Sequence, residues 1–308
     1  MKILVTGGTV FVSRYMAEYY SGKGHEVYVL NRNTRPQPPN TTLIQADRHD
    51  LENILRPYNF DLVIDTAYTA SDVNTLLDAL SSVSDYILIS SSAVYPETAP
   101  QPFAEESPTG PNRYWGKYGT DKIEAETALL KRVPGAYVLR PPYLYGPMNN
   151  VYREAFVFDC ASLGRKFYLP GDGSQRLQFF HIRDLCRFAE VLLLKRPGRH
   201  IFNVGNRDAV SVREWAELCY RVLGKEPEFV NVRGDVEQRN YFCFYDYEYM
   251  LDVTEQYVLM DSVTDLEEGL REAWEWYRKK GDKVNRKQYF EYIDRNLPEI
   301  LEDNKCQS

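Results

Sequence analysis

Histidine and cysteine are scarce in this sequence, and a surplus of positive charge is absent. The chain of 308 residues has four histidines, and its five cysteines show no metal-site spacing: Cys160, Cys186, Cys219, Cys243 and Cys306. We therefore predict free thiols in a reducing compartment and no bound metal. The formal net charge of −7 lacks the basic footprint of nucleic-acid-binding proteins, so we expect no nucleic-acid partner.

Long hydrophobic runs are also missing. No apolar stretch approaches the roughly 20 residues that a membrane-spanning helix requires, so we expect a cytoplasmic protein without a membrane partner. A chain of 308 residues can hold one large α/β domain with a smaller appended lobe.

The beginning of the chain has the pattern of a β-α-β unit. A short apolar run at Ile3–Val5 breaks at Gly7 and Gly8, a helical pattern follows as far as Tyr20, and Glu26–Leu30 reads as the next buried strand. A glycine turn at this place presents the amides of a helix N-terminus to a pyrophosphate. We predict a dinucleotide site over the two glycines, and the alternative is a β-α-β unit with an unoccupied turn.

Two further buried strands are predicted, at Asp61–Asp65 and Tyr86–Ser90. The second ends in a serine triplet, which in isolation is typical of an ordinary turn. This triplet lies at the carboxyl end of a strand, where open α/β sheets bind ligands, and that position favours a functional role. Strands alternate with helices as far as Leu139, so we predict a Rossmann-type, doubly wound parallel sheet.

The pattern becomes irregular after Pro147. We predict a dinucleotide-binding domain over residues 1–147. Residues 148–308 are predicted to form mainly a smaller α/β substrate-binding lobe, with a segment near 201–204 that returns to the main sheet. Two capping boxes, Ser211–Glu214 and Thr264–Glu267, predict helices in this second part.

Tyr118 and Lys122 are spaced to lie one turn apart on the same face of a helix. An ammonium held there favours the phenolate and lowers the pKa of the tyrosine from its resting value of about 10. The phenol then becomes a usable general acid and base. Tyr19 and Lys23 have the same spacing, but Gly22 marks the end of their helix, so position in the chain favours Tyr118 and Lys122.

Together these motifs resemble those of the extended short-chain dehydrogenase/reductase family, of the NAD(P)-dependent epimerase/dehydratase type. The resemblance covers nearly the whole chain and rests on segments in the family's order: Thr6–Thr9, Asp47, Ser90–Tyr95, Tyr118 with Lys122, Arg140–Pro147, Pro170–Gln175, His181–Asp184 and Phe202–Asn206. The sequence looks most like a branch with a degenerate glycine motif, whose second strand ends Asn31-Arg32 and whose third is followed by Asp47-Arg48.

The resemblance implies a catalytic group of three residues. Ser91 would orient a substrate oxygen, Tyr118 would give or take its proton, and Lys122 would bind the nicotinamide ribose and lower the tyrosine pKa. Ser92 is the rival for the role of Ser91. The candidate substrate-binding residues are Ser92, Tyr143 and Arg176.

By the same resemblance, the cofactor would contact the glycine turn and the ends of the second and third strands. Asp47 is the expected acceptor for the adenine amino group. The acid that NAD enzymes use to bind the ribose 2′-hydroxyl is missing, while arginines are available for a 2′-phosphate, so the cofactor is NAD or NADP with a tilt to NADP. The predicted cofactor-binding residues are Gly7, Gly8, Val10, Phe11, Asn31, Arg32, Arg35, Asp47, Arg48 and Lys122.

Three departures from the family pattern bear on function. Val10 and Ser13 stand where the family has its second and third glycines, and a β-branched residue at position 10 should crowd the approach of a dinucleotide. Tyr143 stands where the nucleotide-sugar members have an asparagine. Ser91 is followed by Ser-Ala, where sugar dehydratases have Asp-Glu, so we expect no dehydratase activity.

The sequence predicts an NAD(P)-dependent oxidoreductase or epimerase that acts on a hydroxyl or carbonyl group of a small substrate, with sugars and nucleotide sugars as candidates. The alternative is a non-catalytic or RNA-associated binding protein that retains the fold, since chloroplast relatives of this branch are associated with RNA.

The family commonly forms a homodimer through the helix that carries the tyrosine and lysine, and we expect a homodimer here. The apolar positions on that helix suit either such an interface or packing on the sheet: Ile123, Ala125, Ala128 and Leu129.

Overall fold

The structure is a computed structural model that describes residues 1–82 and 84–303, with side chains as far as residue 297. The chain divides into two compact units. The first comprises Met1–Leu144, Gln178–Arg207 and Met250–Thr264, and the second comprises Tyr145–Leu177, Asp208–Tyr249 and the residues from Asp265 onward.

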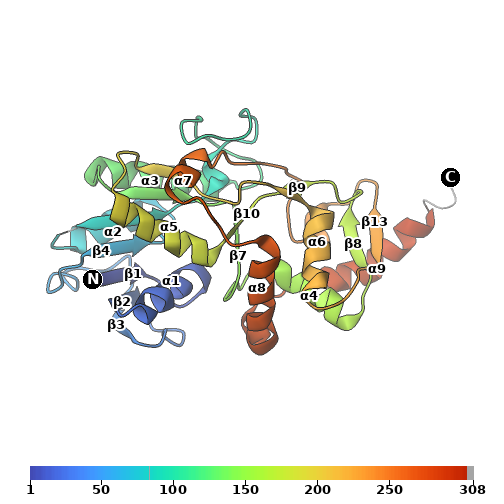
Figure 1. Cartoon of the computed structure of the whole chain (residues 1–308), viewed down its shortest axis with the longest axis horizontal. Coiled ribbons are helices and arrows are strands. Elements are labelled where there is room, and N and C mark those ends of the chain that lie inside the picture. Colours follow the sequence, from blue (N-terminus) through green and yellow to red (C-terminus); the bar gives the residue numbers. More distant parts are fainter. Residues whose placement is uncertain (83, 304–308) are drawn as a thin grey trace. The chain divides into compact units, whose positions relative to one another are not determined.

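The first unit is built around a seven-stranded sheet whose neighbours all run parallel (Figure 1). Its order is β11-β6-β5-β4-β1-β2-β3. The strands are β1 (Lys2–Thr6), β2 (Glu26–Asn31), β3 (Thr41–Gln45), β4 (Leu62–Asp65), β5 (Asp85–Ile89), β6 (Tyr137–Arg140) and β11 (Ile201–Asn203). The strand order reverses between β1 and β4, which is where sheets of this type bind ligands. The predicted doubly wound parallel sheet is confirmed.

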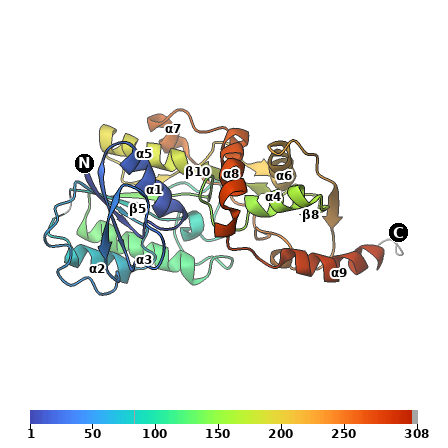
Figure 2. The same ribbon diagram turned by 90° about the horizontal axis from the view of Figure 1, so that it is seen from below.

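Helices cover both faces of this sheet (Figure 2). α1 (Phe11–Gly22) and α5 (Ile182–Lys195) lie on one face, and α2 (Ala70–Ala79) and α3 (Lys117–Arg132) lie on the other. α7 (Thr254–Leu259) contacts α5, and a short 3-10 turn, η1 (Ser92–Val94), follows β5. Outside the main sheet, β7 (Tyr143–Tyr145) pairs with β10 (Phe179–His181).

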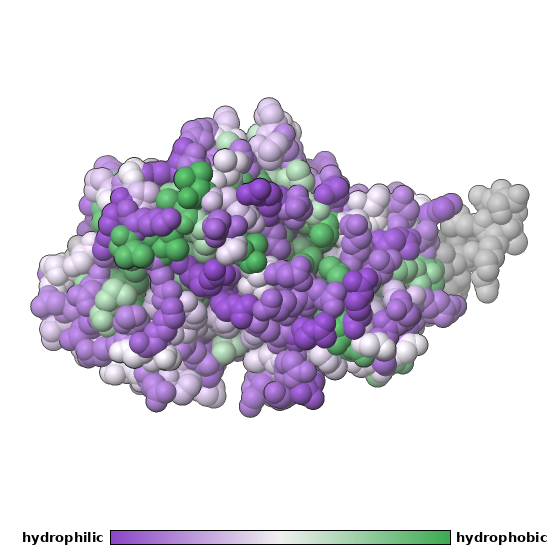
Figure 3. All heavy atoms as spheres, in the orientation of Figure 1, coloured by the Kyte–Doolittle hydropathy of each residue, from purple (hydrophilic) through white to green (hydrophobic). Residues whose placement is uncertain are grey.

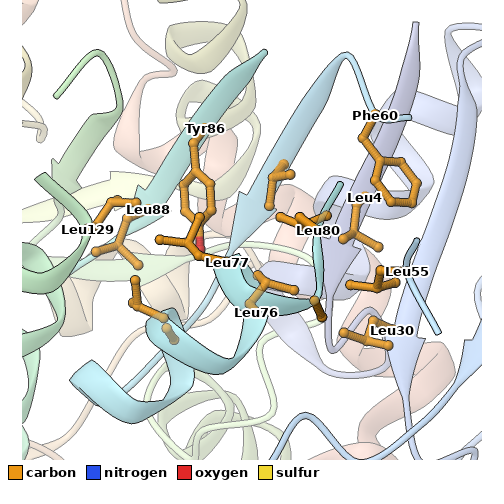
Figure 4. Close-up of a cluster of buried hydrophobic side chains, with 14 of the residues drawn as sticks. Leu4, Leu30, Leu55, Phe60, Leu76, Leu77, Leu80, Tyr86, Leu88 and Leu129 are labelled. Carbon is orange, nitrogen blue, oxygen red and sulfur yellow. The ribbon is translucent and has the colours of Figure 1, made fainter. Parts of the chain in front are cut away.

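A leucine-rich core lies between α2 and the sheet (Figure 4). Leu76 and Leu77 of α2 belong to one buried cluster with Leu4 of β1 and Leu88 of β5. Leu129 of α3 is part of the same cluster. Burial of these side chains removes apolar area from water and so holds α2 and α3 against one face of the sheet.

The second unit is smaller. Its helices are α4 (Glu154–Leu163), α6 (Val212–Arg221), α8 (Leu266–Lys280) and α9 (Tyr289–Asp303). Its strands pair as β8 (Phe167–Pro170) with β13 (Phe229–Val232), and as β9 (Arg176–Leu177) with β12 (Val210–Ser211). The 3-10 turns are η2 (Gln238–Asn240) and η3 (Gly281–Lys283).

Both predicted helices of this unit are present, and one of the two predicted caps differs. α6 begins at the predicted capping box of Ser211 and Glu214. α8 is capped by Asp265, whose carboxylate accepts two backbone N–H groups of the first turn. Thr264 does not take this role: its Oγ1 accepts from Arg183 at 3.1 Å, and its backbone N–H donates to Asp184 at 2.6 Å.

The face shown in Figure 3 is mostly hydrophilic, with hydrophobic side chains gathered over α5 and α7. Two of the large apolar side chains on these helices, Leu194 and Val258, are exposed. Within residues 1–82 and 84–303, no helix combines the length and apolar character needed to cross a membrane. The four cysteines of that part are buried free thiols, and Cys306 lies outside the described residues.

α3 approaches the loop after β5 so closely that one position of the helix has to be glycine. A Cβ atom at Gly119 would lie 2.4 Å from the backbone oxygen of Ala93, in η1. Real contacts of this kind are never so short, and a backbone oxygen cannot turn aside as a side chain does. Gly119 therefore brings the helix of Tyr118 against the turn that follows Ser91.

We expect Gly119→Ala to lower the free energy of unfolding by about 1–3 kcal/mol, because an added methyl group must displace η1 or α3. In an open helical position the same change stabilises by up to about 1 kcal/mol, because glycine is a poor helix former. Gly22, the last residue of α1, has no neighbouring heavy atom within 4 Å of the place that a methyl group would take, so Gly22→Ala is the matched control. Urea unfolding measures both variants, and equal effects would contradict the close approach.

Candidate active site

The turn after β1 has the backbone that the sequence predicts for a glycine motif. Gly7 and Gly8 have φ angles of +81° and +78°, a region that favours glycine. A Cβ atom at Gly8 would lie 2.5 Å from Cγ1 of Val29 on β2, and one at Gly7 would lie 3.1 Å from Oγ of Ser13 on α1. The turn therefore lies tight against its neighbours, and both glycines are required by conformation and by space.

Val10 and Phe11 lie where this turn becomes α1. Val10 is the N-cap in an extended conformation and makes no side-chain cap bond, so its side chain leaves the first amides of the helix to another partner. Phe11 is the first helical residue and has a φ of +31°, a strained value for a residue with a side chain. The Oγ of Ser13 donates to the carbonyl of Val10 at 3.1 Å, which ties the turn to the helix.

A cavity of about 360 Å³ opens beside this turn, at the carboxyl ends of β1, β2, β3 and β4. Six of the predicted cofactor-binding residues line it: Gly7, Asn31, Arg32, Arg35, Asp47 and Arg48. The other lining residues are Thr6, Thr9, Leu30, Thr34, Ala46, His49, Thr66 and Tyr68. Their common signal in the sequence is position, because they lie at or just after the end of a predicted strand.

Asn31, at the end of β2, holds the two sides of this cavity together. Its amide nitrogen donates to the carbonyl of Gly7 at 2.7 Å and to Oε1 of Gln37 at 2.9 Å. Its oxygen accepts the backbone N–H of Asn33 at 2.8 Å. Asn31 thus links the glycine turn to the loop that carries Arg35, and a ribose hydroxyl would have to replace one of these bonds.

Asp47 and Arg32 face each other across the cavity mouth. Nη1 of Arg32 lies 3.9 Å from Oδ2 of Asp47, and both side chains are well exposed. The other oxygen of Asp47 accepts the backbone N–H of His49 at 3.0 Å. An ion pair this long and this exposed contributes little to stability, so both groups are available to a ligand.

Arg48 is anchored below the cavity by two acids. Its guanidinium donates to Asp65 at 3.2 Å and lies 3.2 Å from Oδ1 of Asp72. Asp65 is fully buried at the end of β4 and also accepts hydrogen bonds from Thr6 and Tyr86, both at 2.6 Å. Burial, together with the Asp65 carboxylate, raises the pKa of Tyr86 well above its ordinary value. Neither Asp65 nor Asp72 was predicted from the sequence as a site residue.

Lys122 lies on α3 with its ammonium buried against the sheet. Its Nζ donates to the carbonyl of Ala67, after β4, at 2.6 Å and to that of Ile89, at the end of β5, at 2.8 Å. Nζ lies 5.9 Å from the ring centroid of Tyr118 and 5.0 Å from that of Tyr68. The predicted pair therefore stands together on one helix, and a second tyrosine joins it.

The electrostatic surroundings of Lys122 act in opposite directions. Burial lowers the pKa of its ammonium, to about 8, although the carboxylates of Asp65 and Glu126 act to raise it. Tyr118 is 37% exposed, whereas Lys122 is buried. The arrangement provides a phenol beside a positive charge that titrates near the working pH of most enzymes.

The serine triplet divides into three environments. Ser90 is buried and its hydroxyl donates to Glu126. The Oγ of Ser91 accepts the backbone N–H of Ala93 at 3.1 Å and caps η1, while Ser92 is buried within that turn. Ser91 is the more accessible of the two candidate hydroxyls.

The Arg140–Pro147 motif contributes a buried ion pair. Nη2 of Arg140 donates to Oε2 of Glu126 at 2.6 Å, and Nη1 donates to the hydroxyl of Tyr95 at 2.8 Å. The Tyr95 hydroxyl donates in turn to Asn203 at 2.8 Å. This series of hydrogen bonds joins α3 to the ends of β6 and β11. Arg140 and its partners therefore hold the helix of Tyr118 and Lys122 in place. Loss of either Arg140 or Glu126 is strongly destabilising, because the remaining charge is then buried without a partner.

The remaining candidates lie in different environments. Tyr143 is buried in the first unit, with its ring centroid 6.2 Å from that of Trp115. Arg176 belongs to the second unit, where its guanidinium donates to the carbonyl of Ala209. His181 is fully buried, and burial lowers its pKa to about 4, so its imidazole is neutral at physiological pH. Among the described residues, no group of three His, Cys, Asp or Glu side chains is arranged to hold a metal.

We expect the ammonium of Lys122 to titrate near pH 8, against about 10.5 for an ordinary lysine. Because the folded chain then holds this proton more weakly than the unfolded chain, the contribution of Lys122 to the free energy of unfolding rises with pH between these two values. The ε-carbon resonance of Lys122 in ¹³C-labelled protein, assigned with Lys122→Met, reports the titration. Lys117, on the same helix with its side chain 81% exposed, is the internal control, and a common midpoint above pH 10 for both lysines would contradict the expectation.

Two curated proteins show how far the sequence similarity extends. The chain is 29% identical over 300 residues to chloroplast stem-loop binding protein of 41 kDa b from Arabidopsis thaliana, which covers 89% of this chain and 78% of that protein. It is also 29% identical over 270 residues to a UDP-glucose 4-epimerase from Corynebacterium glutamicum, covering 73% of this chain and 81% of that one.

A solved structure shows the same fold. The dTDP-glucose 4,6-dehydratase of Bacillus anthracis, determined in complex with NAD, superposes with a TM-score of 0.74 and 22% identity, over 92% of this chain and 98% of that chain. The sequence profile of one family matches residues 3–80 and 69–205, which include the glycine turn, the cavity and the Tyr118–Lys122 helix. The chain is a member of the NAD dependent epimerase/dehydratase family.

Proposed function

We propose that this protein is an NAD(P)-dependent oxidoreductase or epimerase that acts on a hydroxyl or carbonyl group of a sugar or nucleotide-sugar substrate. The observation that carries the proposal is the ammonium of Lys122, buried beside the ring of Tyr118 and tied to the carbonyl of Ala67, next to residues that line the cavity. The names of relatives, among them a UDP-glucose 4-epimerase, support the substrate class.

Apart from Val10, whose β-branched side chain at the turn should crowd the approach, the residues present fit a dinucleotide. Both glycines of the turn have positive φ angles, and the first amides of α1 have no side-chain cap. Gly7 and Gly8 would receive the pyrophosphate, Asp47 the adenine amino group, and Lys122 the nicotinamide ribose. A bound nicotinamide supplies the acceptor or donor of hydride.

The chain's own residues then handle the proton. Tyr118 gives a proton to the substrate oxygen, or takes one from it, and the charge of Lys122 stabilises the phenolate form between these steps. Ser91 orients the same oxygen. The two residues after Ser91 lie in η1 and include no acid, which argues against elimination of water.

The proposed preference is for NADP over NAD. Arg32 and Arg35 line the cavity beside the end of β2, where an acid would disfavour a 2′-phosphate, and the residue at that place is Asn31. Arg32 has a side chain that is 70% exposed, so it can move to a ligand without breaking a buried contact.

Calorimetry with NAD, NADH, NADP and NADPH tests the cofactor. We expect binding of at least one pair, tighter for the phosphorylated form, and we expect Arg32→Ala with Arg35→Ala to weaken NADP binding by about 3–10-fold, a modest factor because exposed charges are screened. Arg56→Ala removes a positive charge away from the cavity and should change nothing. Absence of heat with all four dinucleotides would contradict the enzyme proposal.

A substrate can be sought by adding sugar nucleotides, free sugars and small ketones to the protein with its dinucleotide. A change in the absorbance of the reduced nicotinamide identifies turnover. With such a substrate, Tyr118→Phe should lower kcat by about 10²–10⁴-fold at nearly unchanged cofactor affinity, because it removes the proton donor alone. Lys122→Met should lower both kcat and cofactor affinity. Ser91→Ala should lower kcat more than Ser92→Ala does. Tyr114→Phe is the matched control, and wild-type turnover by Tyr118→Phe would overturn the mechanism.

A second candidate function is binding of RNA. It is favoured by the similarity to a stem-loop binding protein along most of the chain, and the net charge of −7 weighs against it. Tight binding of a stem-loop RNA, together with no binding of any dinucleotide, would favour this candidate.

A homodimer and a reducing, cytoplasmic setting complete the proposal. Ala125 and Leu129 belong to the chain's own core, which leaves the partly buried Ile123 and Ala128 of α3 as the apolar positions nearer the surface. Sedimentation at micromolar concentration tests the assembly, and a species of one chain would contradict it.

A further inference from the structure

Tyr68 borders both the cavity and the ammonium of Lys122. It follows β4 in the segment Thr66–Tyr68, lines the cavity and keeps 59% of its surface exposed. Its backbone is held at the start of α2, because its N–H donates to Asp72 at 2.9 Å and Thr69 caps the helix. The ring is therefore presented from a rigid point of the fold.

One ammonium faces two tyrosine rings. Nζ of Lys122 lies 5.0 Å from the ring centroid of Tyr68 and 5.9 Å from that of Tyr118. The two rings are 5.8 Å apart and inclined by 59°. These distances fall within the range in which the face of an aromatic ring attracts a cation, and the ring of Tyr68 is the nearer of the two.

The ammonium has little capacity left for a ligand. An ammonium carries three N–H donors, and two of those of Lys122 go to the carbonyls of Ala67 and Ile89. The ring of Tyr68 belongs both to the cavity wall and to the surroundings of Nζ, so it lies beside the route from the cavity to the remaining donor.

We propose that Tyr68 is a positioning residue that covers the ammonium of Lys122 and competes with the ligand for it. In the free protein the face of the Tyr68 ring accepts the third N–H donor of the ammonium. The ring turns aside when a ligand hydroxyl accepts that donor instead. Tyr68 therefore sets how readily the Tyr118–Lys122 pair engages a cofactor. The competition with a cofactor rests on the proposed function, whereas the shielding of the Lys122 ammonium by Tyr68 does not.

Three variants test this inference. Tyr68→Ala removes the ring, and Tyr68→Phe keeps the ring and removes only the hydroxyl. Tyr257→Ala is the matched control, because it removes a contact of the same kind: the guanidinium of Arg207 lies 4.5 Å from the centroid of that ring, and Tyr257 is not part of the cavity wall. Thermal unfolding of each variant confirms that the fold is retained.

The first readout needs no cofactor. Reductive methylation of Lys122, followed by peptide mass spectrometry and normalised to the exposed Lys117 of the same protein, measures access to the ammonium. We expect Tyr68→Ala to speed the reaction at Lys122 several-fold, and Tyr68→Phe and Tyr257→Ala to react as the wild type does. An unchanged rate of Lys122 methylation in Tyr68→Ala would contradict the claim that Tyr68 shields this ammonium.

The second readout is the Kd for NAD and NADP. Because the ring no longer competes, Tyr68→Ala should bind the dinucleotide about two- to fivefold more tightly, the factor that corresponds to one partly exposed cation–π contact, and Tyr68→Phe should match the wild type. Weaker binding by Tyr68→Ala would overturn the competition and make the ring a support for the ligand. If the wild type bound neither dinucleotide, the proposed function would fail, while the methylation rates would still decide whether Tyr68 covers Lys122.

Discussion

A buried ammonium is the constraint on which the candidate site depends. Nζ of Lys122 is removed from water, and the carbonyls of Ala67 and Ile89 replace part of its hydration. Taking a charge out of water is costly unless such bonds are made. The lysine therefore draws α3 to the carboxyl ends of β4 and β5, and Gly119 permits the approach because it carries no side chain. The start of α3 and the η1 turn, which Ser91 caps, come together as a consequence.

The same strand ends supply the cavity. β4 ends at the buried Asp65, which fixes Arg48 and Thr6 on the cavity side, and the next three residues carry a bond to Lys122 and the ring of Tyr68. One short segment thus joins the dinucleotide-type pocket to the tyrosine–lysine pair. The proposed function requires such sharing, because one dinucleotide would have to contact both features.

Much of this arrangement follows from local sequence signals. The period of the apolar residues predicts the parallel sheet, the spacing of Tyr118 and Lys122 predicts one helix face, and the capping box at Ser211 predicts the start of α6. These signals are contained within a few neighbouring residues, and local backbone geometry is enough to interpret them.

What the sequence did not indicate depends on partners far apart in the chain. Arg140 pairs with Glu126 and Arg48 pairs with Asp65, and no spacing rule connects either pair. Asp265 caps α8 in place of Thr264, whose hydroxyl accepts from Arg183 and whose backbone N–H donates to Asp184. Tyr68 was missed for the same reason, since its position over Lys122 exists only once α3 is packed on the sheet.

A crystal structure of the protein with NADP would test the central claim, that the glycine turn and the Lys122 ammonium serve one dinucleotide. The account predicts the pyrophosphate over Gly7 and Gly8, and a ribose hydroxyl within hydrogen-bond distance of Nζ of Lys122. A dinucleotide bound elsewhere, or one bound at the turn with no group in reach of Lys122, would contradict it.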